Sequence, residues 1–179
     1  MKRGSFWKNG FYHQGDFALK QVLVSQGRPK VEEIPEPVVA PGAVLVRVDH
    51  SCISAGTEMS GIEAGGEPLW KRAIRRPDRV KKAIGMALTQ GVSRTKDMVE
   101  GKLSAGAPTG YSAAGVVIAG GEGVEDLGPG DRVACAGAQC AHHAEVICVP
   151  RNLVVPAPDG VGFPAASTVT LGAIALQGV

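Results

Sequence analysis

Apolar and polar positions alternate over short stretches along most of the chain, and turn residues separate these stretches. LKQVLVS (19–25) and AVLVRVDHSCI (43–53) are rich in β-branched residues and have the period of two that is typical of strands. Further strands are predicted within AAGVVIAGG (113–121), DRVACAG (131–137) and HHAEVICVPRNLVVPAP (142–158). Turns every ~8–12 residues are typical of a β-barrel or sandwich, so the pattern predicts a mainly β fold.

The stretch KVEEIPEPVV (30–39) is extended but differs from the other strands. Pro35 and Pro37 exclude a helix there. Because proline cannot donate a hydrogen bond to a neighbouring strand, this segment is predicted at the edge of a sheet.

Two segments have helical rather than strand-like patterns. Residues 68–103 place apolar side chains at helical spacing among basic ones, which predicts a helical insertion. FPAASTVTLGAIALQGV (163–179) is apolar on every side, which favours a C-terminal helix packed on both faces.

The first residues, 1–17, hold five of the eight aromatic side chains and follow no regular period. They are interpreted as a poorly ordered leader, with docking on the domain through the aromatic rings as the alternative. The predicted organisation is therefore a leader followed by one domain, 18–179, that carries the helical insertion at 68–103.

Composition and charge narrow the possible partners. The chain has 179 residues, 44% hydrophobic and 20% charged, with a net charge of +2, as expected for a globular protein. Residues 69–102 hold ten of the nineteen Lys and Arg residues but only three of the seventeen acidic ones. A solvated helical face explains this better than a nucleic-acid site, because the basic stretch 71–82 lacks interleaved aromatic residues.

Cysteine content and hydropathy indicate where the protein resides. Four cysteines in a chain of this length do not make a disulfide framework, which favours reduced thiols in the cytoplasm. No apolar run approaches the ~20 residues of a membrane span, and no secretion signal is evident at the start. We therefore expect no membrane partner.

Four segments together carry a family resemblance: 35–58, 110–133, 142–161 and 165–176. They resemble, in this order, the N-terminal GroES-like domain of the medium-chain dehydrogenase/reductase superfamily, which includes alcohol dehydrogenases and quinone reductases. The most specific motif is G-V-x-x-L-x-P-G-D-R-V at 123–133. SAGTE, the basic insertion, GYS and TLGAIALQGV look most like the zinc-free N-terminal unit of bacterial bi-domain oxidoreductases.

The resemblance implies a partly open β-barrel on the substrate side of a longer enzyme. In such enzymes a Rossmann domain binds NAD or NADP, and its fingerprint is G-x-G-x-x-G. No such fingerprint occurs in this chain. The cofactor domain is therefore expected to be missing, the chain to be a fragment, and the isolated chain to be inactive.

The resemblance also implies that the catalytic zinc of related enzymes is absent. Matching the family motifs places Ser54 near the cysteine ligand, Tyr111 at the histidine ligand and Leu171 at the third ligand, and these side chains are poor or impossible zinc ligands. A separate site from Cys135, Cys140, His142 and His143 has suitable donors but matches no known spacing. The preferred interpretation is no metal.

Without zinc, the protein must place the substrate and stabilise charge on its oxygen by hydrogen bonds. The candidate donors on the two turns that line the cleft in the family are Ser54, Thr57, Tyr111 and Ser112, and Glu58 orients a hydroxyl or braces its turn. The alternative for Tyr111 is packing, and for the hydroxyls it is backbone capping. Thr168 and Thr170 are the candidate cofactor contacts, and His50 is interpreted as a satisfied strand histidine.

The function predicted on this basis is that of the substrate-side domain of a zinc-independent NAD(P)-dependent oxidoreductase. It transfers hydride to or from a carbonyl, alcohol or enone, with a small-molecule substrate and a possible homo-oligomer. The alternative is a non-catalytic barrel that docks a partner through its apolar C-terminal helix.

Overall fold

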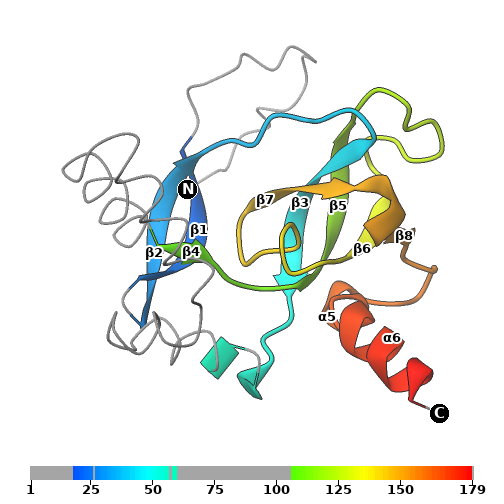
Figure 1. Cartoon of the computed structure of the whole chain (residues 1–179). Helices are drawn as coiled ribbons and strands as arrows, with labels where there is room; N and C mark the ends of the chain where they lie inside the picture. The colour runs from blue at the N-terminus through cyan, green and yellow to red at the C-terminus, as the bar shows by residue number, and fades with distance from the viewer. Residues whose placement is uncertain (1–17, 26, 57, 60–105, 179) are drawn as a thin grey trace, which may run out of the picture.

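The computed structural model describes residues 18–25, 27–56, 58–59 and 106–178 (Figure 1). The predicted leader at 1–17 and the predicted helical insertion at 68–103 lie outside the described residues. Everything below concerns the described part of the chain.

The described part is mainly β, as predicted, and strands occupy nearly every stretch with an alternating pattern. In chain order the elements are β1 (Ala18–Ser25), β2 (Arg28–Pro35), β3 (Ala43–Ser51), β4 (Ala107–Pro108), β5 (Ser112–Gly120), β6 (Arg132–Ala136), β7 (Val146–Pro150), a 3-10 turn (Arg151–Leu153), β8 (Val154–Pro156), α5 (Phe163–Ala166) and α6 (Val169–Gln177). Residues 55–56 and 58–59 are also helical.

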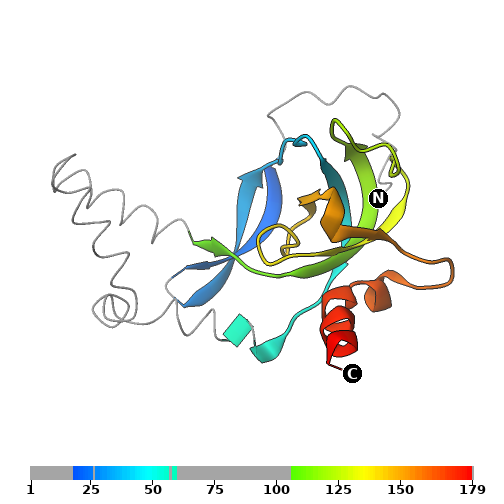
Figure 2. The same ribbon diagram turned by 45° about the vertical axis from the view of Figure 1, so that its right-hand side comes forward.

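The strands form two antiparallel sheets, one of order β2-β1-β4 and one of order β7-β3-β5-β6-β8. Figures 1 and 2 show the smaller sheet standing beside the larger one, with α5 and α6 below β6 and β8. The two sheets do not close into a barrel, which agrees with the predicted partly open architecture. The proline-containing strand β2 lies at a sheet edge, also as predicted.

The core lies against the larger sheet and consists mostly of small β-branched side chains. Its fully or nearly fully buried members are Val44, Val46, Ala113, Val117, Leu127, Val133, Cys135, Ala141, Ile147, Val149 and Val154. Burying one valine or leucine side chain stabilises a fold by about 1.5–3 kcal/mol. All of these residues except Leu127 and Ala141, which lie on connecting loops, come from β3, β5, β6, β7 and β8, so the core holds the five strands together.

The central strands β3 and β5 approach each other unusually closely at Gly115. A Cβ placed there would lie 2.0 Å from the backbone oxygen of Arg47. The pairing of β3 with β5 also shifts register twice, between Leu45 and Val46 and between Val48 and His50. Such bulges bend a strand and redirect the side chains that follow it.

The C-terminal segment differs from its prediction. The single helix packed on both faces is wrong: the segment forms two helices, separated at Ser167 and Thr168, and none of the residues of α6 is buried. The exposed fractions of Leu171, Ile174 and Leu176 are 39%, 63% and 80%. The apolar side chains of this segment therefore form an exposed surface and are not buried against the described residues.

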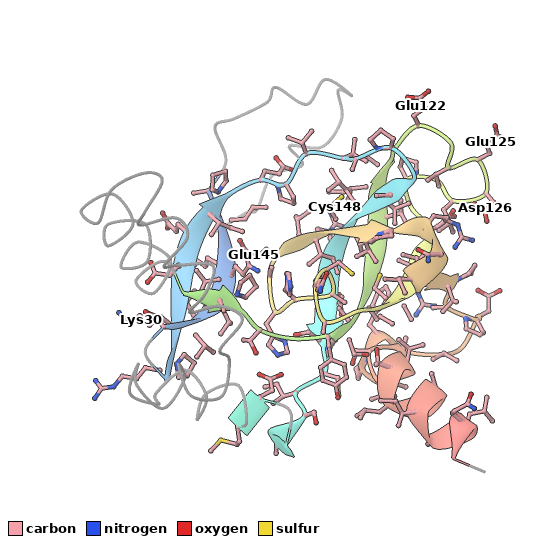
Figure 3. The ribbon with its side chains drawn as sticks, in the orientation of Figure 1. Lys30, Glu122, Glu125, Asp126, Glu145 and Cys148 are labelled. Carbon is pink, nitrogen blue, oxygen red and sulfur yellow. The ribbon has the colours of Figure 1, made fainter. Side chains whose placement is uncertain are left out.

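Three of the acidic side chains labelled in Figure 3, Glu122, Glu125 and Asp126, gather on the loop between β5 and β6. This loop lies at the opposite end of the larger sheet from residues 52–59 and from α6. Arg151 binds the carboxylate of Asp126 there through two nitrogens, with Nε to Oδ1 at 2.9 Å. The hydrogen bond from Arg151 lowers the pKa of Asp126. These charges therefore lie far from the site described next.

Candidate functional site

The end of β3 and the start of β5 lie side by side and bring the two predicted turns together. The backbone N–H of Cys52 donates to the carbonyl oxygen of Ser112 at 2.9 Å. The chain after Cys52 then forms a helical turn in which the N–H of Glu58 donates to the carbonyl of Ser54 at 2.9 Å. Thr57, another predicted site residue, falls outside the described residues.

Ser112 is fully buried, and its hydroxyl joins β5 to the C-terminal helices. It donates to the carbonyl oxygen of Ser167 at 2.6 Å and accepts from the N–H of Thr170 at 3.2 Å. The hydroxyl of Ser112 thus both donates and accepts a hydrogen bond within the domain. This geometry gives Ser112 a structural role in the described conformation.

The hydroxyls of Thr168 and Thr170, the candidate cofactor contacts, also bind backbone oxygens. Thr168 donates to the carbonyl of Ala165 at 2.8 Å, and Thr170 donates to the carbonyl of Tyr111 at 3.1 Å. Tyr111 itself is buried, with 8% of its surface exposed. The predicted residues Tyr111, Ser112 and Thr170 therefore meet in one place, beside the start of α6.

A partly buried hydrogen-bond network joins Ser51, Glu58, Thr109 and His143, which we call the His143 cluster. His143 Nε2 lies 2.6 Å from Glu58 Oε1, and His143 Nδ1 lies 2.8 Å from Ser51 Oγ. The second carboxylate oxygen of Glu58 accepts from the Thr109 hydroxyl at 3.1 Å. The exposed fractions of the His143 and Glu58 side chains are 9% and 13%.

Hydrogen bonds hold the backbone of His143 as well as its ring. Its N–H donates to the carbonyl of Thr109 at 2.9 Å, and its carbonyl accepts from the N–H of Val22 at 2.8 Å. Gly110 has a φ of +100°, and a Cβ there would lie 2.7 Å from the backbone nitrogen of His143. Only glycine therefore allows the chain before Tyr111 to pass so near to His143.

A second histidine–carboxylate pair provides a contrast. His50 Nδ1 lies 2.5 Å from Asp49 Oδ1, but the side chains of His50 and Asp49 are 50% and 49% exposed. Water screens such a pair and lowers its energetic value. Of these two pairs, only His143 with Glu58 is shielded from solvent and connected to further side chains.

One residue of this cluster, Glu58, is among the site residues predicted from the sequence. Glu58 was predicted to orient a hydroxyl or brace its turn, and it does contact a hydroxyl, that of Thr109. In the sequence, His143 is a candidate only as a metal ligand, and no motif marks Ser51 or Thr109. His143 lies 85 residues from Glu58 and 92 from Ser51, so no local spacing could have revealed the contacts.

The alternative metal site at Cys135, Cys140, His142 and His143 does not assemble in the described part of the chain. No group of three or more His, Cys, Asp or Glu residues there could hold a metal ion. His143 is bound to Ser51 and Glu58, and burial raises the pKa of the Cys135 thiol to about 12. Without a metal ion, Cys135 therefore favours its neutral thiol form.

Cys140 and His142 instead line a small cavity of about 170 Å³ beside β1, together with Gln21 and Cys148. Burial raises the pKa of Cys140 and lowers that of His142, so both groups favour their neutral forms. All four cysteines of the chain are free thiols.

Comparison with solved structures identifies the fold. The quinone oxidoreductase from Coxiella burnetii is 18% identical, with a TM-score of 0.61 over 90% of this chain and 44% of that one. CurK enoyl reductase is 17% identical, with a TM-score of 0.61 over 90% and 42%. An alcohol dehydrogenase superfamily protein from Novosphingobium aromaticivorans is 22% identical, with a TM-score of 0.53 over 85% and 38%.

The chain thus shares the fold of the corresponding part of these solved structures, in agreement with the fold that its motifs predict. It spans about two fifths of the length of these oxidoreductases. No protein-family model and no curated protein sequence matches it. Within the described residues, none of the helices has the length and apolar character needed to cross a bilayer.

Proposed function

We propose that this chain is the substrate-side domain of a zinc-independent, NAD(P)-dependent oxidoreductase. The observation that carries the proposal is the fold shared with quinone oxidoreductases and enoyl reductases over nine tenths of the chain. The reaction is hydride transfer to or from a carbonyl, alcohol or enone. A separate domain holds the dinucleotide, because this chain has no G-x-G-x-x-G fingerprint.

The proposed substrate position is the strand end where Cys52 meets Ser112. The bound nicotinamide supplies the hydride. The chain's own residues orient the substrate and stabilise charge on its oxygen, and the candidates are Tyr111, Ser54 and Thr57. The Ser112 hydroxyl contributes to this site by holding α6 in place.

The proposed independence from zinc rests on the donor set. Tyr111 stands where the resemblance places a histidine ligand, and it is buried beside Thr170. A neutral phenol and the serine at position 54 are poor zinc ligands compared with a thiolate and an imidazole. In this proposal, hydrogen-bond donors of the protein polarise the substrate oxygen in place of a zinc ion.

The test uses the complete reading frame that contains this chain. The purified protein is mixed with NADH or NADPH and an aldehyde, an ortho-quinone or an enone, and loss of the reduced nicotinamide is followed by absorbance. We expect turnover with at least one acceptor and no stoichiometric zinc by elemental analysis. Absence of turnover with all three acceptors would refute the oxidoreductase proposal, and one zinc ion per chain that is required for activity would refute zinc independence.

A second candidate function rests on the exposed apolar face of α6, formed by Leu171, Ile174 and Leu176. In that case the chain is a non-catalytic module, and this helix binds a partner or a second copy. The double variant Ile174→Gln/Leu176→Gln removes the two most exposed side chains of that face. If sedimentation analysis shows wild-type association that this variant abolishes, and the complete protein has no reductase activity, the docking function is preferred.

A further inference from the structure

Gln21 places a polar side chain at a buried position of β1, two residues from Leu19 and from Leu23 on the same face of the strand. Only 7% of its surface is exposed, and its amide makes no hydrogen bond within the described part of the chain. Every fully enclosed side-chain nitrogen and oxygen among the described residues does have a partner. The Gln21 amide is therefore not enclosed by protein, and it opens into the cavity of about 170 Å³ that the residue lines.

The backbone that carries Gln21 is fixed on both sides. On one side β1 pairs with β2 along its whole length. On the other side the N–H of Val22 donates to the carbonyl of His143 at 2.8 Å, and the N–H of Glu145 donates to the carbonyl of Lys20 at 3.0 Å. A ligand in the cavity therefore meets a strand that is already ordered, which lowers the entropic cost of binding.

The charge of the cavity wall restricts the kind of ligand. None of the described residues that line the cavity is Lys, Arg, Asp or Glu, and Ile34, Pro37 and Val146 supply apolar surface. Burial lowers the pKa of the His142 imidazole, so this ring also favours its neutral form. A charged ligand would lose its hydration there without gaining an opposite charge. The wall therefore favours a neutral ligand.

The volume of the cavity and its opening restrict the size of the ligand and its route of entry. A cavity of about 150 Å³ holds a molecule the size of benzene, so this one accommodates a ring or short chain of that size. The exposed Gln139 and the partly exposed His142 border it, so it opens to solvent on that side. The Gln21 amide offers both a donor and an acceptor, and one carbonyl or hydroxyl group is enough to pair with it.

We propose that this cavity binds a neutral molecule of about the size of benzene whose carbonyl or hydroxyl oxygen pairs with the Gln21 amide. The cavity shares no described residue with the proposed substrate position, so the inference goes beyond the proposed oxidoreductase function. The alternative is a cavity that holds only water, which then satisfies the amide. In that case no organic molecule of this size competes for the space.

The cysteines of the chain report where a ligand binds, because Cys140 and Cys148 line the cavity and Cys52 does not. The protein made from the complete reading frame is treated with iodoacetamide without nicotinamide, and labelling of each cysteine is followed by mass spectrometry of its peptides. Cyclohexanone is expected to slow labelling of Cys140 and Cys148 severalfold and to leave Cys52 unchanged. Cyclohexylammonium, a charged ring of the same size, is expected to protect neither cavity thiol.

The variant Gln21→Leu tests the hydrogen bond directly, and its folding is checked by the amide NMR spectrum. The concentration of cyclohexanone that gives half-maximal protection is expected to rise about tenfold. Gln139→Leu is the matched control, because it removes an exposed amide at the rim of the same cavity, and its value is expected to stay at that of the wild type.

Three results overturn the site. They are absence of protection up to the solubility limit of cyclohexanone, equal protection by cyclohexylammonium, and equal half-maximal concentrations in the wild type and Gln21→Leu. If Gln21→Leu does not fold, Ile34→Phe decides, because it fills the cavity from a partly exposed position of the edge strand β2. Ile34→Phe is expected to abolish protection, and protection that persists in this variant overturns the proposal.

Discussion

A single methyl group is enough to test how closely β3 and β5 approach each other. In Gly115→Ala the new Cβ meets the Arg47 backbone oxygen, which lies 2.0 Å from the ideal position, and the backbone of a central strand has little freedom to move. We expect a loss of about 4 kcal/mol or more in the free energy of unfolding. Urea denaturation measures it, or soluble yield if the variant does not fold.

The control for this substitution is Gly172→Ala in α6, where no atom lies within 4 Å of the added Cβ. Alanine favours a helix over glycine by about 1 kcal/mol, so this variant is expected to be as stable as the wild type or slightly more stable. A Gly115→Ala variant that loses less than about 1 kcal/mol would contradict the close approach of the strands.

The buried Cys135 thiol predicts a dependence of stability on alkaline pH. Burial raises its pKa from 9.0 to about 12, so between these values the folded state binds more protons than the unfolded state. The stabilisation is complete below pH 9 and is lost as the pH rises toward 12, because unfolding then releases a proton.

Urea midpoints measured at several values between pH 8 and about 11 test this dependence. The wild-type midpoint is expected to fall more steeply with pH than that of Cys135→Ala, which lacks the thiol but keeps every other titrating group. Equal slopes for the two proteins would contradict the raised pKa.

At the scale of elements, Ser112 connects the C-terminal helices to the larger sheet. Ser112→Ala removes one acceptor and one donor from a fully buried position and leaves the N–H of Thr170 without its partner. The expected cost is about 1–3 kcal/mol in the free energy of unfolding, with faster amide exchange throughout α6.

Thr168→Ala is the matched control, because that exposed hydroxyl binds only the carbonyl of Ala165. Its expected cost is below about 0.5 kcal/mol. If Ser112→Ala and Thr168→Ala have equal effects on α6, then Ser112 does not hold the helix. In that case Ser112 is free for the role in substrate binding that the sequence predicted.

At the scale of the whole molecule, the two sheets should differ in local stability. β3 and β5 each pair with a strand on both sides and supply much of the core, whereas β2 is an exposed edge strand of the smaller sheet. Amide hydrogen exchange is therefore expected to be slowest in β3 and β5 and faster in β2 and α6. Exchange in β2 as slow as in β3 would show that the two sheets unfold as one unit.

Local patterns in the sequence predicted most of the fold, because the strands other than the two-residue β4 show alternation and most turns contain glycine or proline. The edge position of β2 followed from Pro35 in the same way. The break at Ser167 and Thr168 was not predicted. The exposure of α6 was not predicted either, since apolar composition does not distinguish a buried helix from an exposed one. The His143 cluster was missed because it depends on contacts between residues far apart in the chain.

The register shift after Val48 has a consequence for insertions and deletions. Asp49 is the extra residue, since Val48 pairs with Gly115 and His50 with Ala114. The bulge places Ser51 opposite Ala113, on the same face of the sheet as Val48 and the core. Deletion of Asp49 would remove the bulge and leave Ser51 opposite Ala113, on the core face. Insertion of one residue between His50 and Ser51 would instead move Ser51 by one position and turn its side chain to the other face of the sheet.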